Sequence, residues 1–306
     1  MITMNNEYDL KHWLNTVCPD DGKQVNLVNF HGGKWFVPDN LRSQFLEYYT
    51  AIFLKKRIQH FNFIAYEKTW LVHPYLDVDF PRLVDFEFML SHRNIDASSF
   101  YQTVIKEFGD ALGVTQELIP SSIEFFRKPH ETHKFHLVCK NSEYVMTKSE
   151  MMQRIWHMAR NLHTLLNLAD FEHQPMQKEK KVKNETTLID LPWSHTCPIE
   201  NIPTSNVDLI ASFVDVTAPG IRPIGSGKAG ERDFNQTYQL MEPSTDEIIM
   251  ISQADELDSH MIAARGNDNN RKQRDSFQQK QIPLESLTEV KFTNLFIFLN
   301  SNLTTC

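Results

Sequence analysis

The stretch Tyr75-Leu76-Asp77-Val78-Asp79-Phe80 alternates apolar and acidic side chains. Side chains of a β-strand point alternately to opposite faces, so Asp77 and Asp79 are expected on one face and the apolar side chains on the other. Neighbouring carboxylates repel, and burying them unpaired is costly, but a Mg2+ or Mn2+ ion removes that cost by binding their oxygens. The stretch predicts a metal-binding strand. The alternative is a pair of solvent-facing aspartates on an edge strand.

A basic residue and a histidine share one face of a second predicted strand. In the run KFHLV, alternation places Lys134 and His136 together, which suits contact with a phosphate group. His130, His133 and His136 are spaced three apart, a pattern that also occurs in zinc sites. Residues three apart on a strand face opposite ways, and Pro129 disfavours a helix, so no zinc is predicted.

A third acidic residue, Asp215, precedes the basic segment GIRPIGSGK at residues 220–228. The segment is not a Walker A motif, because the first glycine of that motif would fall on Arg222 and Lys228 is followed by alanine. Arg222 and Lys228, with Ser226 and small residues between them, could bind several phosphate oxygens through side chains and N–H groups. The alternative is an ordinary polar turn.

The order of these motifs along the chain resembles that of the archaeo-eukaryotic primase superfamily, specifically the primase-polymerase domains of large DNA viruses. The order is a pair of aspartates, a basic residue two before a histidine, a lone aspartate, and then an arginine with a lysine. The stretch GGKWFVP at residues 32–38 also resembles those viral domains, and the resemblance covers about residues 25–240. It implies catalytic metal ligands at Asp77, Asp79 and Asp215, holding two Mg2+ or Mn2+ ions. It implies nucleotide-binding residues at Lys134, His136, Arg222, Ser226 and Lys228.

The resemblance also implies a fold and an activity. The expected fold is α+β, with an RRM-like β-sheet module combined with an N-terminal α/β module. The expected activity is template-dependent primer synthesis or DNA polymerisation, in which nucleotides are added with release of pyrophosphate. The partners are then a single-stranded DNA template and NTPs or dNTPs, with a replicative helicase as a candidate. Two alternatives remain: a metal-dependent glycosyltransferase, which uses a D-x-D motif for a sugar nucleotide, and a catalytically inactive replication scaffold.

Composition narrows the protein class. The chain has 306 residues, of which 41% are hydrophobic and 23% charged, which excludes wholesale disorder. Its formal net charge of −8 argues against a protein that coats nucleic acid, but not against a basic groove in an enzyme. The four cysteines form no CxxC pair, and there is neither a secretory signal nor a membrane-length apolar run. We expect a soluble intracellular protein that acts at sites of DNA replication.

Periodicity predicts the following elements along the chain. Helices are expected at residues 9–17, 40–53, 98–112, 205–213 and from Thr147, where Thr147-x-x-Glu150 fits a capping box. Strands are expected at residues 25–30, 34–37, 61–65, 70–80, 122–127, 134–139, 221–224, 236–241 and 247–251. The lysine-rich residues 173–187 read as a solvated loop, with contact to a phosphate backbone as the alternative.

Three segments are expected in the domain organisation. Residues 1–252 form the catalytic domain, and residues 253–285 form a polar linker or disordered tail, because Asp, Asn, Gln, Arg and Lys dominate there. Residues 286–306 are a short apolar segment that docks on the domain or leads to a further one.

Overall fold

The computed structural model describes residues 6–18, 25–29, 31–60, 62–65, 71–171, 173–182, 185–196, 209–228 and 233–251. The chain divides into two compact units, Met1–Asn269 and Asn270–Cys306, and all of the described residues belong to the first. The predicted segments 253–285 and 286–306 therefore lie outside the described residues. The first unit is a mixed α+β structure with small antiparallel sheets, as the sequence predicts.

The central sheet is antiparallel and carries the aspartate strand at one side. Its order is β14 (Gln239–Leu240), β6 (Ile123–Arg127), β7 (Lys134–Cys139) and β5 (Tyr75–Asp79). Residues 213–215 extend the sheet beyond β5, where Val214 forms an antiparallel bridge with Val78. The backbone N–H groups of Asp215 and Asp79 donate to the carbonyls of Asp77 and Phe213, at 3.0 and 2.9 Å. The edge of β5 is thus covered by a chain segment from far along the sequence.

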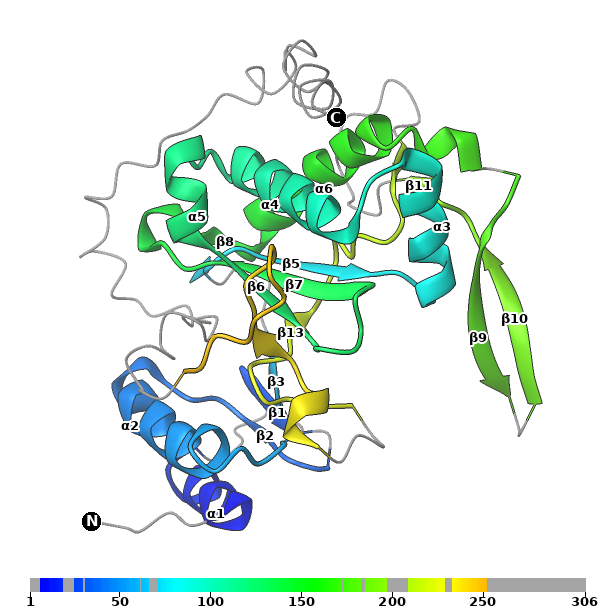
Figure 1. The fold of residues 1–306 in the computed structure, drawn as a ribbon. Helices are drawn as coiled ribbons and strands as arrows, with labels where there is room; N and C mark the ends of the chain where they lie inside the picture. The colour runs from blue at the N-terminus through cyan, green and yellow to red at the C-terminus, as the bar shows by residue number, and fades with distance from the viewer. Residues whose placement is uncertain are drawn as a thin grey trace. The chain divides into compact units, whose positions relative to one another are not determined.

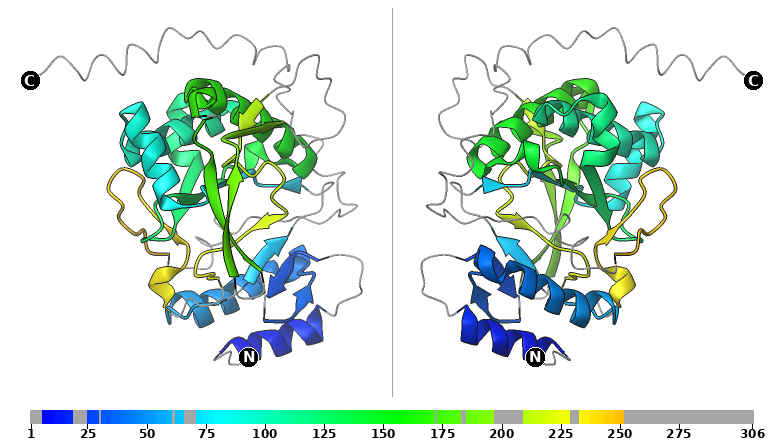
Figure 2. Two further views of the ribbon diagram at one scale, coloured as in Figure 1. Left: turned by 90° about the vertical axis from the view of Figure 1, so that its right-hand side faces the viewer. Right: turned by 90° about the vertical axis from the view of Figure 1, so that its left-hand side faces the viewer.

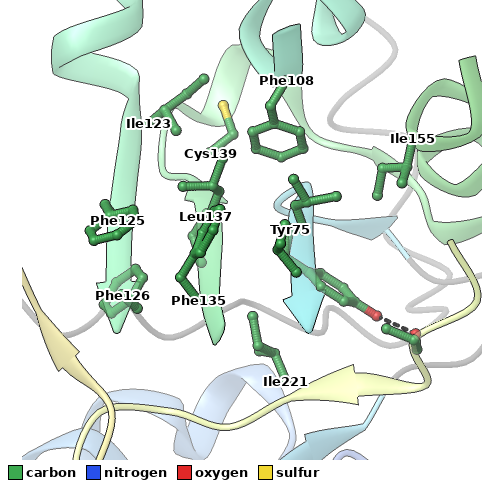
Figure 3. Close-up of a cluster of buried hydrophobic side chains, with 14 of the residues drawn as sticks. Tyr75, Phe108, Ile123, Phe125, Phe126, Phe135, Leu137, Cys139, Ile155 and Ile221 are labelled. Carbon is green, nitrogen blue, oxygen red and sulfur yellow. Dashed lines mark hydrogen bonds between the residues drawn. The ribbon is translucent and has the colours of Figure 1, made fainter. Parts of the chain in front are cut away.

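Helices pack on one face of this sheet (Figure 1). They are α3 (Leu83–Arg93), α4 (Ala97–Leu112) and α6 (Lys148–Leu165). Figure 3 shows Phe108 of α4 near Cys139 of β7, and Ile155 of α6 on the side of Tyr75 of β5. The predicted apolar stripe of α4 is buried, which confirms it as core. Asp96 caps α4 by accepting from the Ser99 N–H. Thr147 caps α6 by accepting from the Glu150 N–H, which confirms the first of the two hydrogen bonds of the predicted capping box.

A second sheet belongs to the N-terminal module, which we define as residues 6–65 together with β13. Its order is β13 (Gly220–Ile221), β3 (Asn62–Ala65), β1 (Leu27–Asn29) and β2 (Lys34–Trp35). The module's helices are α1 (Glu7–Val17), α2 (Asp39–Tyr49) and the π-helix η1 (Thr50–Leu54). The strands predicted at 25–30 and 34–37 are present as β1 and β2, which pair antiparallel as a hairpin. Gly33 is required in its turn, because its φ is +125° and a Cβ atom would overlap the Trp35 ring.

Three sequence-based predictions are wrong. The strand expected at 247–251 is reduced to an isolated bridge between Ile248 and Met241. Residues 173–187 contain most of a β-ribbon, β9 (Met176–Val182) with β10 (Glu185–Leu191), instead of a loop (Figure 2). The expected helix at 205–213 is a strand where it is described, because β12 (Leu209–Ala211) pairs with β11 (Ser194–Thr196). A strand is stabilised by pairing with another strand, and both faces of the ribbon are exposed, so neither residues 173–187 nor residues 205–213 show their structure in local periodicity. Helix α3 was also not predicted.

The remaining elements are short connectors. They are β4 (Leu71–Val72), η2 (Gln116–Leu118), α5 (Ile119–Ser122), η3 (Ser142–Tyr144), β8 (Met146–Thr147), η4 (Leu168–Phe171) and η5 (Phe234–Gln236). Strand β4 pairs with β8. Among the described helices, none combines the length and the apolar character needed to cross a membrane.

Candidate active site

The two aspartates of β5 lie opposite the basic residues of β7. Asp77 is directly across from His136, and Asp79 is across from Lys134. Directly opposed residues share one face of a sheet, so all four side chains emerge together, as the alternation predicts. The distance from Lys134 Nζ to Asp79 Oδ1 is 2.5 Å, and that from His136 Nε2 to Asp77 Oδ1 is 3.4 Å. Each carboxylate thus has a cationic or imidazole partner on the neighbouring strand.

Asp77 and Asp79 differ in their exposure to water. The side chain of Asp77 is 28% exposed and that of Asp79 is 52% exposed. Burial by itself raises the pKa of Asp77, but His136, Lys228 and Lys134 together lower it below its usual value. Asp77 is therefore an anion at neutral pH, and its carboxylate oxygens can bind a cation or accept a hydrogen bond.

Asp215 reaches the site through backbone pairing. The Val78–Val214 bridge places it directly opposite Asp77 on the other side of β5. Its carboxylate accepts hydrogen bonds from the Thr217 N–H at 2.9 Å and the Thr217 hydroxyl at 3.1 Å, and the residue is exposed. The negative charges of Asp215 and Asp77 both raise the pKa of Tyr75, after burial as the main cause, which places both near that ring.

The three carboxylates supply the donor chemistry that Mg2+ and Mn2+ prefer, because all of their ligand atoms are oxygens. They do not converge as a finished cage. Within the described ranges, no group of three or more His, Cys, Asp or Glu side chains is gathered closely enough to hold a metal ion. The three aspartates thus fit a divalent ion by their chemistry and by their positions on neighbouring strands. In this structure, Lys134 and His136 lie beside Asp79 and Asp77.

The basic segment after Asp215 forms a loop tied to the N-terminal module, which we call the 222–228 loop. The backbone N–H of His60 donates to the Gly225 carbonyl at 3.1 Å, and the backbone carbonyl of His60 accepts from the Gly227 N–H at 2.9 Å. The His60 ring is fully buried against Tyr49 and lies 2.9 Å from the Ile224 carbonyl. These contacts fix the loop over the sheet.

The predicted phosphate-binding residues of the loop have different environments. Arg222 donates to the Gly227 carbonyl at 2.7 Å and so closes the loop on itself. Ser226 is fully buried, so its hydroxyl is not presented at the surface of the site. Lys228 is partly exposed, and its pKa is lowered by burial and by the charges of Lys134 and Lys128. Of the three, Lys228 is placed best for a phosphate.

Sequence reasoning missed Lys128 and Tyr238. The Lys128 side chain is buried, with Nζ 3.4 Å from Glu131 and 5.5 Å from the centre of the Tyr238 ring. The Tyr238 ring stacks on His136 with ring centres 4.0 Å apart. Alternation along β6 could have indicated Lys128, because residues 124, 126 and 128 share the face of His136. No pattern in the sequence around Tyr238 indicates that its ring stacks on His136.

The other two histidines of the three-apart pattern lie in the turn between β6 and β7. The carbonyl of His133 accepts the Phe80 N–H at 3.2 Å, which holds this turn against the end of β5. The pattern is therefore distributed over a turn and a strand instead of one helix face.

Comparison of the chain with protein-family models found no matching family, and comparison with curated proteins found no similar protein.

Proposed function

We propose that this chain is a template-dependent primase or DNA polymerase, a nucleotidyltransferase that adds nucleotides with release of pyrophosphate. The observation that carries the proposal is the arrangement of charge on one face of the central sheet. Asp77 and Asp79 lie there beside Lys134 and His136, and the strand pairing puts Asp215 next to Asp77. Such an array combines acidic oxygens for cations with basic groups for a triphosphate.

The sheet topology supports the same proposal. The main elements occur along the chain in the order β5, two helices, the hairpin β6–β7, helix α6 and residues 213–215. Across the sheet, the order of the strands is 213–215, β5, β7, β6. This is a β-α-β-β-α-β arrangement of the RRM-like kind, with helices on one face and the acidic and basic residues of the candidate site on the other. This topology, together with the N-terminal module, supports the proposal.

Asp77, Asp79 and Asp215 would hold the divalent ions. When bound, the ions would activate the attacking hydroxyl and stabilise the leaving pyrophosphate. Lys134, Lys228 and Lys128 would neutralise the triphosphate, since the charges of Lys134 and Lys128 both act on Lys228 and lower its pKa, after burial as the main cause. A shared anion removes the mutual repulsion of the three ammonium groups.

His136 would contact the phosphates from a fixed position. Stacking on Tyr238 restrains the ring, and Asp77 lies beside Nε2. The His136 Nδ1 atom is buried and has no hydrogen-bond partner among the described residues, so it is one polar atom that a bound group could satisfy.

Primer synthesis on single-stranded DNA tests the proposal. Labelled NTPs or dNTPs are supplied with Mn2+, and products are separated by length. Asp77→Asn and Asp79→Asn should each abolish synthesis, because each removes an anionic ligand at nearly unchanged size. Asp110→Asn is the matched control, since Asp110 pairs with Lys106 on the outside of α4. Thermal unfolding of all variants checks the fold. Near-normal synthesis by either site variant contradicts the metal assignment, and no synthesis by the natural chain contradicts the function.

A further inference from the structure

The β9–β10 ribbon is an isolated two-stranded element that projects away from the central sheet (Figures 1 and 2). Seven residue pairs join its strands, from Glu185–Val182 at the tip to Leu191–Met176 at the base. All described side chains from Lys178 to Asp190 are exposed. Two-stranded ribbons are marginally stable by themselves, so a ribbon of this length without a packed face is suited to gaining its packing from a partner.

The two faces of the ribbon differ in charge. On one face, which we call the lysine face, Lys178 lies opposite Ile189 and Lys180 lies opposite Thr187. Its acidic residue, Glu185, is at the tip. The opposite face carries one described lysine and two acids, namely Lys181, Glu179 and Asp190. The ribbon thus presents its positive charge on one side.

The lysine face does not neutralise itself. Cross-strand acid–base pairs commonly stabilise exposed ribbons. Here the residues opposite Lys178 and Lys180 are uncharged. Neither lysine forms an ion pair with any residue that the structure describes. In a chain of net charge −8, two exposed lysines with uncharged residues directly opposite them favour an anionic partner.

The base of the ribbon is packed into the hydrophobic core, on the face of β5 opposite the candidate active site. Trp193 follows β10 and is buried, with its ring 6.4 Å from Phe80. Phe80 is the residue after Asp79, and it stacks at 4.2 Å on Phe213, two residues before Asp215. The same aromatic cluster therefore anchors the base of the ribbon and the chain segments that carry Asp79 and Asp215.

We propose that the lysine face binds the sugar–phosphate backbone of single-stranded nucleic acid. Lys178 and Lys180 lie two residues apart on a strand, about 7 Å along one line, and so can follow one backbone. Thr187 offers a hydroxyl to a phosphate oxygen, and Ile189 offers apolar surface to a sugar or base. That the bound strand is the template rests on the proposed function; binding itself does not.

Fluorescence anisotropy of labelled single-stranded DNA, titrated with the full chain over a range of salt, tests this inference. The double variant Lys178→Ala/Lys180→Ala should bind on the order of tenfold more weakly. Its slope of log affinity against log salt should fall by about 1.4, as for two lost phosphate contacts. Lys181→Ala is the matched control on the same strand and opposite face, and should change neither quantity appreciably. Nucleotide binding, measured separately, should be unchanged in all variants.

The outcomes separate this inference from the proposed function. If the natural chain does not bind the DNA at low salt, or if the double variant keeps its affinity and slope, the ribbon inference is overturned. Equal weakening by Lys181→Ala would also overturn it, because it would indicate diffuse charge and no defined face. If the natural chain synthesises primers but the double variant keeps the salt slope of the natural chain, the proposed function stands and the ribbon inference does not. Ribbon-dependent binding without any primer synthesis leaves the ribbon standing and contradicts the function.

Discussion

Acid should loosen the attachment of the 222–228 loop through the buried histidine His60. Burial lowers the pKa of His60 from 6.5 to about 3, with a smaller contribution from the positive charge of Arg222, while its hydrogen bond to Ile224 acts in the opposite direction. The unfolded chain therefore binds a proton at His60 at a pH where the folded chain does not. Stability from this group is fully present above pH 6.5 and is lost as the pH falls from there toward 3.

The magnitude follows from the two pKa values. One pH unit corresponds to 1.36 kcal/mol, so the loss approaches about 5 kcal/mol at pH 3 and is about 2 kcal/mol between pH 7 and pH 5. His60→Gln removes the titration while keeping a nitrogen near the Ile224 carbonyl, and its stability should depend less on pH by that amount. His12→Gln, at an exposed position of α1, is the matched control.

Urea unfolding followed by tryptophan fluorescence at pH 7 and pH 5 measures the difference. The natural chain and His12→Gln should lose about 2 kcal/mol more on acidification than His60→Gln does. An equal loss in all three proteins would refute the reasoning, because it would mean that His60 accepts its proton without leaving its buried position.

Three further predictions concern the 222–228 loop and Lys128. Arg222→Lys keeps the charge but loses the planar group that donates to Gly227, so the nucleotide KM should rise about fivefold or more, as steady-state kinetics at saturating template would show; an unchanged KM would speak against a role in the loop. Gly225→Ala forces a residue with φ +80° to carry a Cβ 2.9 Å from Phe234, which should cost about 1–3 kcal/mol of stability by urea unfolding; a stable variant would mean that the loop relaxes freely. Lys128→Met keeps the length of a buried side chain and removes its charge, so nucleotide affinity should fall about tenfold while affinity for single-stranded DNA is retained, as parallel titrations would show; equal loss of both would place Lys128 outside the phosphate site.

Local alternation was sufficient to predict how the acidic and basic residues share a face. Asp77 with Asp79, and Lys134 with His136, are two residues apart, and a strand places such pairs on one side whatever its neighbours are. The stripe of α4 and the cap at Thr147 were likewise readable, since both depend on residues within one or two turns. The mixed α+β class follows from these local elements.

Pairing between distant segments was decided only in the tertiary structure. The register that sets Asp77 opposite His136, and the bridge that brings Asp215 beside β5, depend on loop closure over many residues and on burial of one sheet face. The same holds for Tyr238 against His136. The ribbon at residues 176–191 is a local hairpin, but its two exposed faces leave no apolar alternation from which to predict it. The sequence by itself determined which side chains each strand presents; the fold decided which of them meet, because contact requires pairing energy that no short segment contains.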